Sequence, residues 1–309
     1  MESATDQTTD RRDDALIDVT EYGTAGRAAW LDIDWRQHLH QHRIGGRAVN
    51  FAQYGDPAAP PLVLIHGLAG CWQNWLENIP ALAADFNVIA VDLPGFGESE
   101  SPPEEISLPG YAQTVIGLLD LLGIERAAII GNSMGGQTAA QTAIDFPDRT
   151  GRLILVSPAG YSTCDAPPIL AHGIVTAGMI LARVAPRRKL LVTRPRLRQI
   201  ALGGVVAHPD QLSPEMSYEM IGADEKVGFV VAAQAILAHD CRERLADIES
   251  PTLIVWGRND RLVTSRDAER FERRIPGSRK LVLRDTGHCA MVERPEWFNR
   301  TAREFLLAG

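Results

Sequence analysis

The chain has 309 residues, of which 45% are hydrophobic and 23% charged, and its formal net charge is −8. This is the composition of a globular protein with a large core. The negative charge argues against general binding to nucleic acid or to anionic membranes. No apolar run is long enough to cross a bilayer, so we expect no integral membrane segment. The expected partner is a small molecule, and the oligomeric state is left open between monomer and homodimer.

The first 34 residues are expected to form a partly disordered N-terminal extension. The first dozen residues are polar. A secretory signal requires a basic stretch followed by an apolar one, and this segment does not show that pattern. The cysteines are far apart and form no CxxC pair, which favours reduced thiols in a cytoplasmic protein. They are Cys71, Cys164, Cys241 and Cys289.

The chain then alternates between strand-like and helix-like stretches. Residues 35–55 indicate two strands around the turn Gly45–Gly46. Short apolar runs typical of buried strands follow at 62–66, 87–92, 127–131, 152–157, 252–257 and 280–285. Helix-like stretches lie at 73–84, 107–123, 134–146, 264–274 and 295–307. This alternation predicts an α/β protein with a mostly parallel central sheet flanked by helices on both faces.

One interval of the chain, residues 161–245, contains no clear strand. It has helix-like runs at 169–184, 215–221 and 226–240. An insertion of this size after a strand lies where a lid over a crevice would be placed. We therefore expect a helical cap at 161–245, inserted into a core made of residues 35–160 and 246–309.

Three chemically active side chains follow strands of the predicted sheet. Ser133 comes after the run 127–131, Asp260 after 252–257 and His288 after 280–285. In an open parallel sheet the carboxyl ends of the strands meet at one edge, where ligands bind. A hydroxyl, a carboxylate and an imidazole are thus expected at the same edge, in the chain order Ser, Asp, His.

In these features the sequence resembles the α/β-hydrolase fold superfamily, in its serine-nucleophile, esterase- and lipase-like branch. G-N-S-M-G (131–135) matches the G-x-S-x-G nucleophile elbow, and the order of the three residues is that of the family. The stretches HG at 66–67, D-L-P-G-F-G at 92–97 and GH at 287–288 strengthen the match. The resemblance covers about residues 40–160 and 246–307, and it implies the α/β-hydrolase fold with an inserted helical cap.

The resemblance implies a role for each site residue. Ser133 would attack a carbonyl, His288 would take and later return its proton, and Asp260 would orient the imidazole. The backbone N–H groups of Leu68 and Met134 would form the oxyanion hole. An elbow serine must adopt a strained backbone, and the glycines beside it remove Cβ atoms that would collide with neighbouring chain. No metal ion or organic cofactor is implied.

Other residues compete for these roles. Asp165, Asp247 and Asp267 are rivals of Asp260, although none directly follows the strand at 252–257. Cys71 and Cys289 lie near the site in sequence, but neither lies at an elbow, so packing is the better interpretation.

The remaining candidate residues have simpler explanations. His38, His40 and His42 alternate as exposed residues of a strand would, and His66 is expected to shape its loop. The basic run at 187–198 is interpreted as a solvated helical face rather than as a site for an anionic substrate.

The expected activity is hydrolysis of carboxylic esters of small to medium, fairly apolar substrates through an acyl-enzyme on Ser133. An alternative is a carbon–carbon hydrolase of aromatic meta-cleavage products, which G-N-S-M-G-G and W-G-R-N-D also resemble. Against this alternative, the loop reads H-G-L-A-G-C-W, with fewer glycines than that branch carries, and Cys289 stands where that branch has tryptophan. Lactonase, acyltransferase and perhydrolase activities would use the same residues. A non-catalytic receptor is a further alternative, which the intact set of three residues disfavours.

Overall fold

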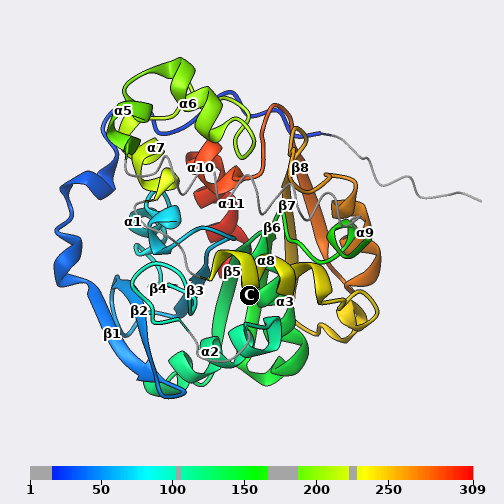
Figure 1. The fold of residues 1–309 in the computed structure, drawn as a ribbon. Coiled ribbons are helices and arrows are strands. Elements are labelled where there is room, and N and C mark those ends of the chain that lie inside the picture. Colours follow the sequence, from blue (N-terminus) through cyan, green and yellow to red (C-terminus); the bar gives the residue numbers. More distant parts are fainter. Residues whose placement is uncertain (1–15, 102–105, 166–186, 223–227, 309) are drawn as a thin grey trace, which may run out of the picture.

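The computed structural model describes residues 16–101, 106–165, 187–222 and 228–308. Its centre is an eight-stranded sheet with the order β1-β2-β4-β3-β5-β6-β7-β8 (Figure 1). The pairs β1–β2 and β2–β4 are antiparallel, and all other pairs are parallel. The mostly parallel sheet predicted from the sequence is therefore confirmed.

The sheet begins with a hairpin made of β1 (Leu39–Ile44) and β2 (Arg47–Tyr54). The two residues between the strands, Gly45 and Gly46, have φ angles of 58° and 84°. Both values lie in the left-handed region that glycine adopts without steric cost, and a two-residue turn of this kind matches the twist of the strands. The predicted turn is thus confirmed.

Six short strands form the parallel part of the sheet, and each corresponds to an apolar run in the sequence. They are β3 (Pro61–Ile65), β4 (Asn87–Val91), β5 (Ala127–Asn132), β6 (Thr150–Val156), β7 (Thr252–Gly257) and β8 (Arg279–Leu283). The central strands are buried on both faces, and for this reason they are continuously apolar rather than alternating.

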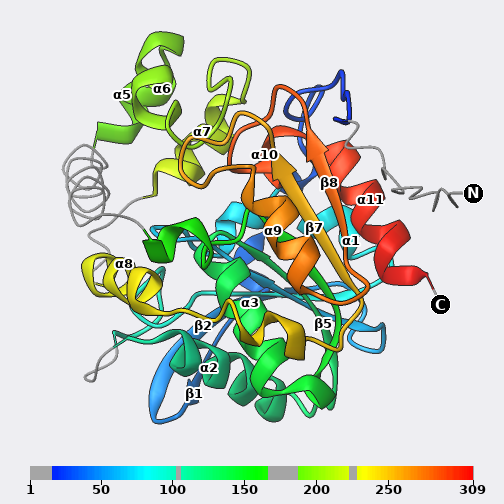
Figure 2. The same cartoon turned by 90° about the vertical axis from the view of Figure 1, so that its right-hand side faces the viewer.

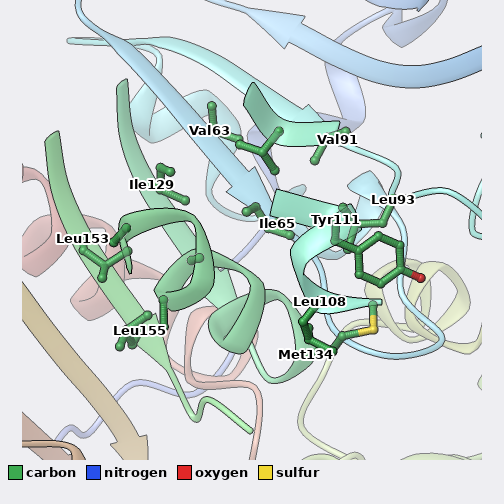
Figure 3. Close-up of a cluster of buried hydrophobic side chains, with 14 of the residues drawn as sticks. Val63, Ile65, Val91, Leu93, Leu108, Tyr111, Ile129, Met134, Leu153 and Leu155 are labelled. Carbon is green, nitrogen blue, oxygen red and sulfur yellow. The ribbon is translucent and has the colours of Figure 1, made fainter. Parts of the chain in front are cut away.

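Successive residues of these strands contribute to two separate hydrophobic clusters, one on each face of the sheet. Figure 3 shows Val63, Ile65, Ile129 and Leu155 on the same face, where α2 (Leu108–Leu121), α3 (Met134–Asp145) and α9 (Asp267–Arg274) cover them. The opposite face is covered by α1 (Ile79–Leu82), α10 (Ala290–Glu293) and α11 (Pro295–Leu307). Alternate side chains point to opposite faces of a strand, which explains the division.

The helix predicted at 73–84 is wrong as a single element. The chain instead forms a 3₁₀ helix at Trp72–Trp75 and the separate α1. Pro80 lacks an N–H and is tolerated only in the first turn, where α1 places it. The amide of Asn78, just before α1, donates to the carbonyl of Met291 (2.9 Å) and to Asn299 (2.8 Å), which ties this break to the C-terminal helices.

In the inserted segment, residues 161–245, the regular elements that the structure describes are helices joined by loops, and none is a strand. Its helices are α5 (Arg188–Val192), α6 (Pro195–Leu202), α7 (Pro214–Ile221) and α8 (Phe229–Ala238). Figure 2 shows α5, α6 and α7 beyond the ends of β7 and β8, with α8 apart from them. The expected helices at 215–221 and 226–240 correspond to α7 and α8. The one expected at 169–184 lies outside the described residues.

Residues 16–34 run along the protein surface and contact the core. Ile17 pairs with Leu283 of β8, and Trp30 is buried. The helices in the described part of the chain are all too short or too polar to cross a membrane.

Candidate active site

Ser133 lies between β5, which ends at Asn132, and α3, which begins at Met134. Its φ of 56° and ψ of −116° are strained for a residue with a side chain, as expected for an elbow. The backbone is held from both sides: the N–H of Ser133 donates to Val156 (2.9 Å), and its carbonyl accepts from Gln137 (3.0 Å) and Ala159 (3.1 Å). These bonds fix the serine at the amino end of a helix, where the helix dipole favours negative charge.

The glycines around Ser133 are required by close backbone contacts. A Cβ on Gly131 would lie 2.1 Å from the carbonyl oxygen of Gly135, and one on Gly135 would lie 2.2 Å from that of Ile65. A Cβ on Gly136 would lie 2.9 Å from the side chain of Pro158. The expected reason for these glycines is therefore confirmed.

Asp260 and His288 form a buried hydrogen-bonded pair. Oδ2 of Asp260 lies 2.7 Å from Nδ1 of His288, and the two side chains are 0% and 4% exposed. Oδ2 also accepts from the indole N–H of Trp256 (3.1 Å). Oδ1 accepts from the N–H groups of Leu262 (2.8 Å) and Val263 (3.0 Å). The carboxylate thus holds the proton of the imidazole on Nδ1 and leaves Nε2 available as a base.

Burial and hydrogen bonding act in opposite directions on Asp260. Burial raises the pKa of the carboxyl group because it disfavours the charged form. Attraction to His288, the hydrogen bond between them and the N–H groups of Val263 and Leu262 outweigh burial, so the pKa lies below its ordinary value of 3.8. Asp260 is therefore ionised at neutral pH.

The strand ends carrying the three residues are joined by hydrogen bonds. The side-chain amide of Asn132 donates to the carbonyl of His288 (3.2 Å), and the N–H of Asn259 donates to Thr286 (2.8 Å). Asn132, which directly precedes Ser133 in the sequence, thus contacts the backbone of His288. Ser133 Oγ makes no hydrogen bond to His288 in the described structure. Catalytic hydrogen bonds often tighten only when substrate is bound.

The two N–H groups expected in the oxyanion hole come from Met134, the first residue of α3, and from Leu68, in the loop after β3. Within the described part of the chain, the N–H groups of Leu68 and Met134 donate to no protein acceptor. Gly67, next to Leu68, is close to Ser133: a Cβ on it would lie 3.2 Å from Cβ of Ser133. The loop that carries Leu68 thus passes close to Ser133, as an oxyanion-hole role for its N–H would require.

His66 and Asp92 organise the loop that carries Leu68. The Nδ1–H of His66 donates to the carbonyl of Gly67 (2.8 Å), and its Nε2 accepts from the N–H of Leu93 (3.0 Å). Asp92, fully buried, accepts from the N–H groups of Trp72 (2.7 Å) and Glu98 (3.1 Å). His66 thus has the loop-shaping role predicted for it.

The rivals of Asp260 are occupied elsewhere. Asp165 pairs with Arg242 (2.7 Å), Asp247 with Arg244 (3.2 Å), and Asp267 with Arg270 (2.9 Å). Cys71 and Cys289 are buried, and burial raises the pKa of the Cys289 thiol well above its ordinary value, which disfavours the reactive thiolate.

His38, just before β1, and the two histidines of β1 contact aromatic rings. His38 and His40 are half-buried rather than exposed as expected, whereas His42 is exposed. His38 contacts Tyr54 edge-on. His40 and His42 stack on Phe51.

Sequence patterns did not identify several polar residues that hold this site. They are Asn132, Trp256, Glu293 and Arg294. Asn132 lies inside the elbow motif and Glu293 follows His288 by five positions, but only the folded contacts show what they bind.

The sequence matches the alpha/beta hydrolase family over residues 62–301. The chain belongs to this family. Among curated relatives it is 32% identical over 298 residues to the 2-hydroxy-6-oxo-6-phenylhexa-2,4-dienoate hydrolase of Comamonas testosteroni, covering 94% of this chain and 99% of that protein. It is 33% identical over 267 residues to the dihydrolipoyllysine-residue acetyltransferase component of the acetoin cleaving system of Pseudomonas putida. This match covers 85% of this chain and 68% of that protein.

A solved structure has a similar fold. The meta-cleavage product hydrolase from Pseudomonas fluorescens IP01 matches with a TM-score of 0.67 and 25% identity, covering 86% of this chain and 96% of that one. These similarities support a hydrolase. They do not support the ester specificity expected from the sequence, and they favour the carbon–carbon alternative.

Proposed function

We propose that this protein hydrolyses a carbon–carbon bond in vinylogous diketo acids, the products of ring cleavage of aromatic compounds. The observation that carries the proposal is the 32% identity to a 2-hydroxy-6-oxo-6-phenylhexa-2,4-dienoate hydrolase, which extends over 94% of this chain and 99% of the relative. A similarity of this extent includes the core and the inserted segment. The paired Asp260 and His288 and the strained Ser133 supply the chemistry that such a reaction needs.

In the proposed reaction, His288 takes the proton of Ser133 Oγ as the oxygen attacks the ketone carbon of the substrate. The carbon–carbon bond next to that ketone then breaks, and its electron pair leaves with the conjugated fragment, which takes the proton from His288. Water, deprotonated by His288, hydrolyses the acyl-enzyme to a carboxylic acid and regenerates Ser133. The N–H groups of Leu68 and Met134 would stabilise the oxyanion, at about 3 kcal/mol for each donor.

Ester hydrolysis is the second candidate, and two features of the sequence favour it. The loop after β3 reads H-G-L-A-G-C-W, and a buried cysteine, Cys289, follows the base. Both depart from the pattern noted for the carbon–carbon branch. An acyl-enzyme on Ser133 would serve both reactions, so the difference lies in substrate recognition.

The test is turnover of 2-hydroxy-6-oxo-6-phenylhexa-2,4-dienoate, followed as loss of its visible absorbance, beside a series of p-nitrophenyl esters from acetate to palmitate. We expect faster turnover of the diketo acid and a loss of about 10⁶-fold in Ser133→Ala. Turnover of the esters without turnover of the diketo acid would contradict the proposal and would identify the protein as a serine esterase. No labelling of the folded protein by a fluorophosphonate would contradict both reactions.

A further inference from the structure

Glu293 is a fully buried carboxylate in the last turn of α10, five residues after His288. Its Oε1 accepts from the N–H of Cys289 (3.1 Å). Its Oε2 accepts from the N–H of Gly287 (2.8 Å), from the N–H of Ala207 (2.9 Å) and from the hydroxyl of Tyr22 (2.7 Å). A buried carboxylate is costly unless it is well hydrogen-bonded, and all of these partners are donors.

Two of these donors lie directly before and after His288. Binding the N–H groups of Gly287 and Cys289 with one rigid carboxylate fixes the backbone on both sides of the imidazole. The N–H of His288 itself donates to the carbonyl of Val205 (2.9 Å). The segment that carries His288 is therefore tied to Glu293 and to the inserted segment at three consecutive residues.

The other two donors come from distant parts of the chain. Ala207 belongs to the inserted segment, and Tyr22 belongs to the N-terminal segment. The hydroxyl of Tyr22 also accepts from the N–H of His208 (2.8 Å), so it joins Glu293 to the same loop as Ala207. Three separate regions of the sequence thus meet at one carboxylate.

Arg294 adds a second restraint on the same loop. Its guanidinium is buried and donates to the hydroxyl of Thr286 (3.1 Å) and to the carbonyl of Asp285 (2.7 Å). It also lies over the ring of Tyr22, 4.7 Å from the ring centre. These contacts of the guanidinium order the residues that lead into His288.

We propose that Glu293 is a positioning residue that sets the orientation of His288. Tyr22 supports Glu293 by its hydrogen bond, and in this way the N-terminal segment helps to position His288. The proposal rests on the proposed function in that His288 is taken as the base. Glu293 faces the backbone of the loop and not the imidazole ring, so it acts through Gly287 and Cys289. A displacement of about 1 Å at a catalytic group can reduce the rate by about 10²-fold.

Glu293→Gln is the sharpest variant because it keeps the size of the side chain. A carboxamide has only one acceptor oxygen, and its NH₂ group would face either the N–H of Cys289 or the donors at Oε2. Glu77→Gln is the matched control. Glu77 is a partly buried carboxylate that also accepts a hydrogen bond from the N-terminal segment, through Thr24. In the described part of the chain it has no hydrogen bond to the loop that carries His288.

The experiment measures three quantities on the full-length protein: kcat and KM on the best substrate, the rate of fluorophosphonate labelling, and the downfield proton resonance of His288 Nδ1–H. In Glu293→Gln we expect kcat and the labelling rate to fall by about 10²-fold with KM little changed, and the resonance to shift or broaden. Tyr22→Phe removes one donor and is expected to cause a smaller change in the same direction. Glu77→Gln should leave all three quantities unchanged.

An unchanged labelling rate and resonance in Glu293→Gln would overturn the proposal and leave a purely structural role for the carboxylate. If Glu293→Gln does not fold, Tyr22→Phe decides by the same readouts, and a resonance identical to that of the wild type would overturn the proposal. If the wild type is neither labelled nor active, the proposed function fails by itself. The resonance of the variants then still shows whether Glu293 orients the imidazole.

Discussion

The two sides of the candidate site are held in place by opposite means. Around Ser133 the structure depends on glycines: Gly131, Gly135 and Gly136 have no side chain, and this allows close contact with neighbouring parts of the chain. Around His288 it depends on buried charged side chains, with Asp260 on the ring and Glu293 on the flanking N–H groups. The serine side is therefore fixed locally, whereas the histidine side is assembled from residues far apart in the chain.

Of the substitutions on the histidine side, Asp260→Asn should reduce activity most. The amide presents an N–H or an oxygen without charge to Nδ1, so the imidazole loses both its tautomer control and its partner charge. We expect kcat to fall by about 10⁴-fold, with the protein still folded. The measurement is steady-state turnover beside circular dichroism. Asp165→Asn is the control, since Asp165 is an exposed residue paired with Arg242. Activity close to wild type in Asp260→Asn would show that the acid has been misassigned.

Gly135→Ala should break the serine side. The added Cβ would lie 2.2 Å from the carbonyl oxygen of Ile65, where backbone must move. We expect a loss of about 1–3 kcal/mol in the free energy of unfolding, measured by urea denaturation, together with reduced labelling of Ser133. Gly204→Ala is the matched control, because a Cβ at Gly204 meets nothing within 4 Å. Equal stability of the two variants would contradict the steric argument.

The charge on Asp260 makes the stability of the histidine side depend on pH. Its pKa is lowered in the folded protein, so it stabilises the fold above the unfolded pKa near 3.8, and this contribution is lost as the pH falls through the folded value. As the pH falls from neutral to well below 3.8, the wild type should lose more stability than Asp260→Asn. Urea denaturation at both pH values tests this. Parallel losses in the two proteins would exclude a stabilising charge.

The sequence predicted the parts of the molecule that depend on local patterns. Each apolar run became a strand of the parallel sheet, and the Gly45–Gly46 hairpin formed where expected. The elbow around Ser133 was predictable because its glycines are adjacent in sequence and their steric purpose is local. The boundary at Asn78 and Pro80 was missed because helical periodicity continues across it, whereas proline and a long-range amide contact end the helix.

The support of His288 was not predictable in the same way. Glu293 looks like a surface residue in the sequence, since charged side chains are rarely buried. Its burial becomes favourable only when Gly287, Ala207 and Tyr22 converge on it, and these residues are up to 271 positions from Glu293. The pairing of Asp260 with Trp256 depends likewise on the turn after β7.

The pairing of Ile17 with β8 has a consequence for self-association. β8 is the last strand of the sheet, and such an edge offers unpaired N–H and C=O groups to other chains. Ile17 donates to the carbonyl of Val282 (2.8 Å) and accepts from the N–H of Arg284 (2.9 Å), so it occupies part of that edge. The exposed Arg279 on β8 adds a charge that discourages the docking of a second copy there. The N-terminal segment thus shortens the free part of the edge at which a second molecule could add a strand.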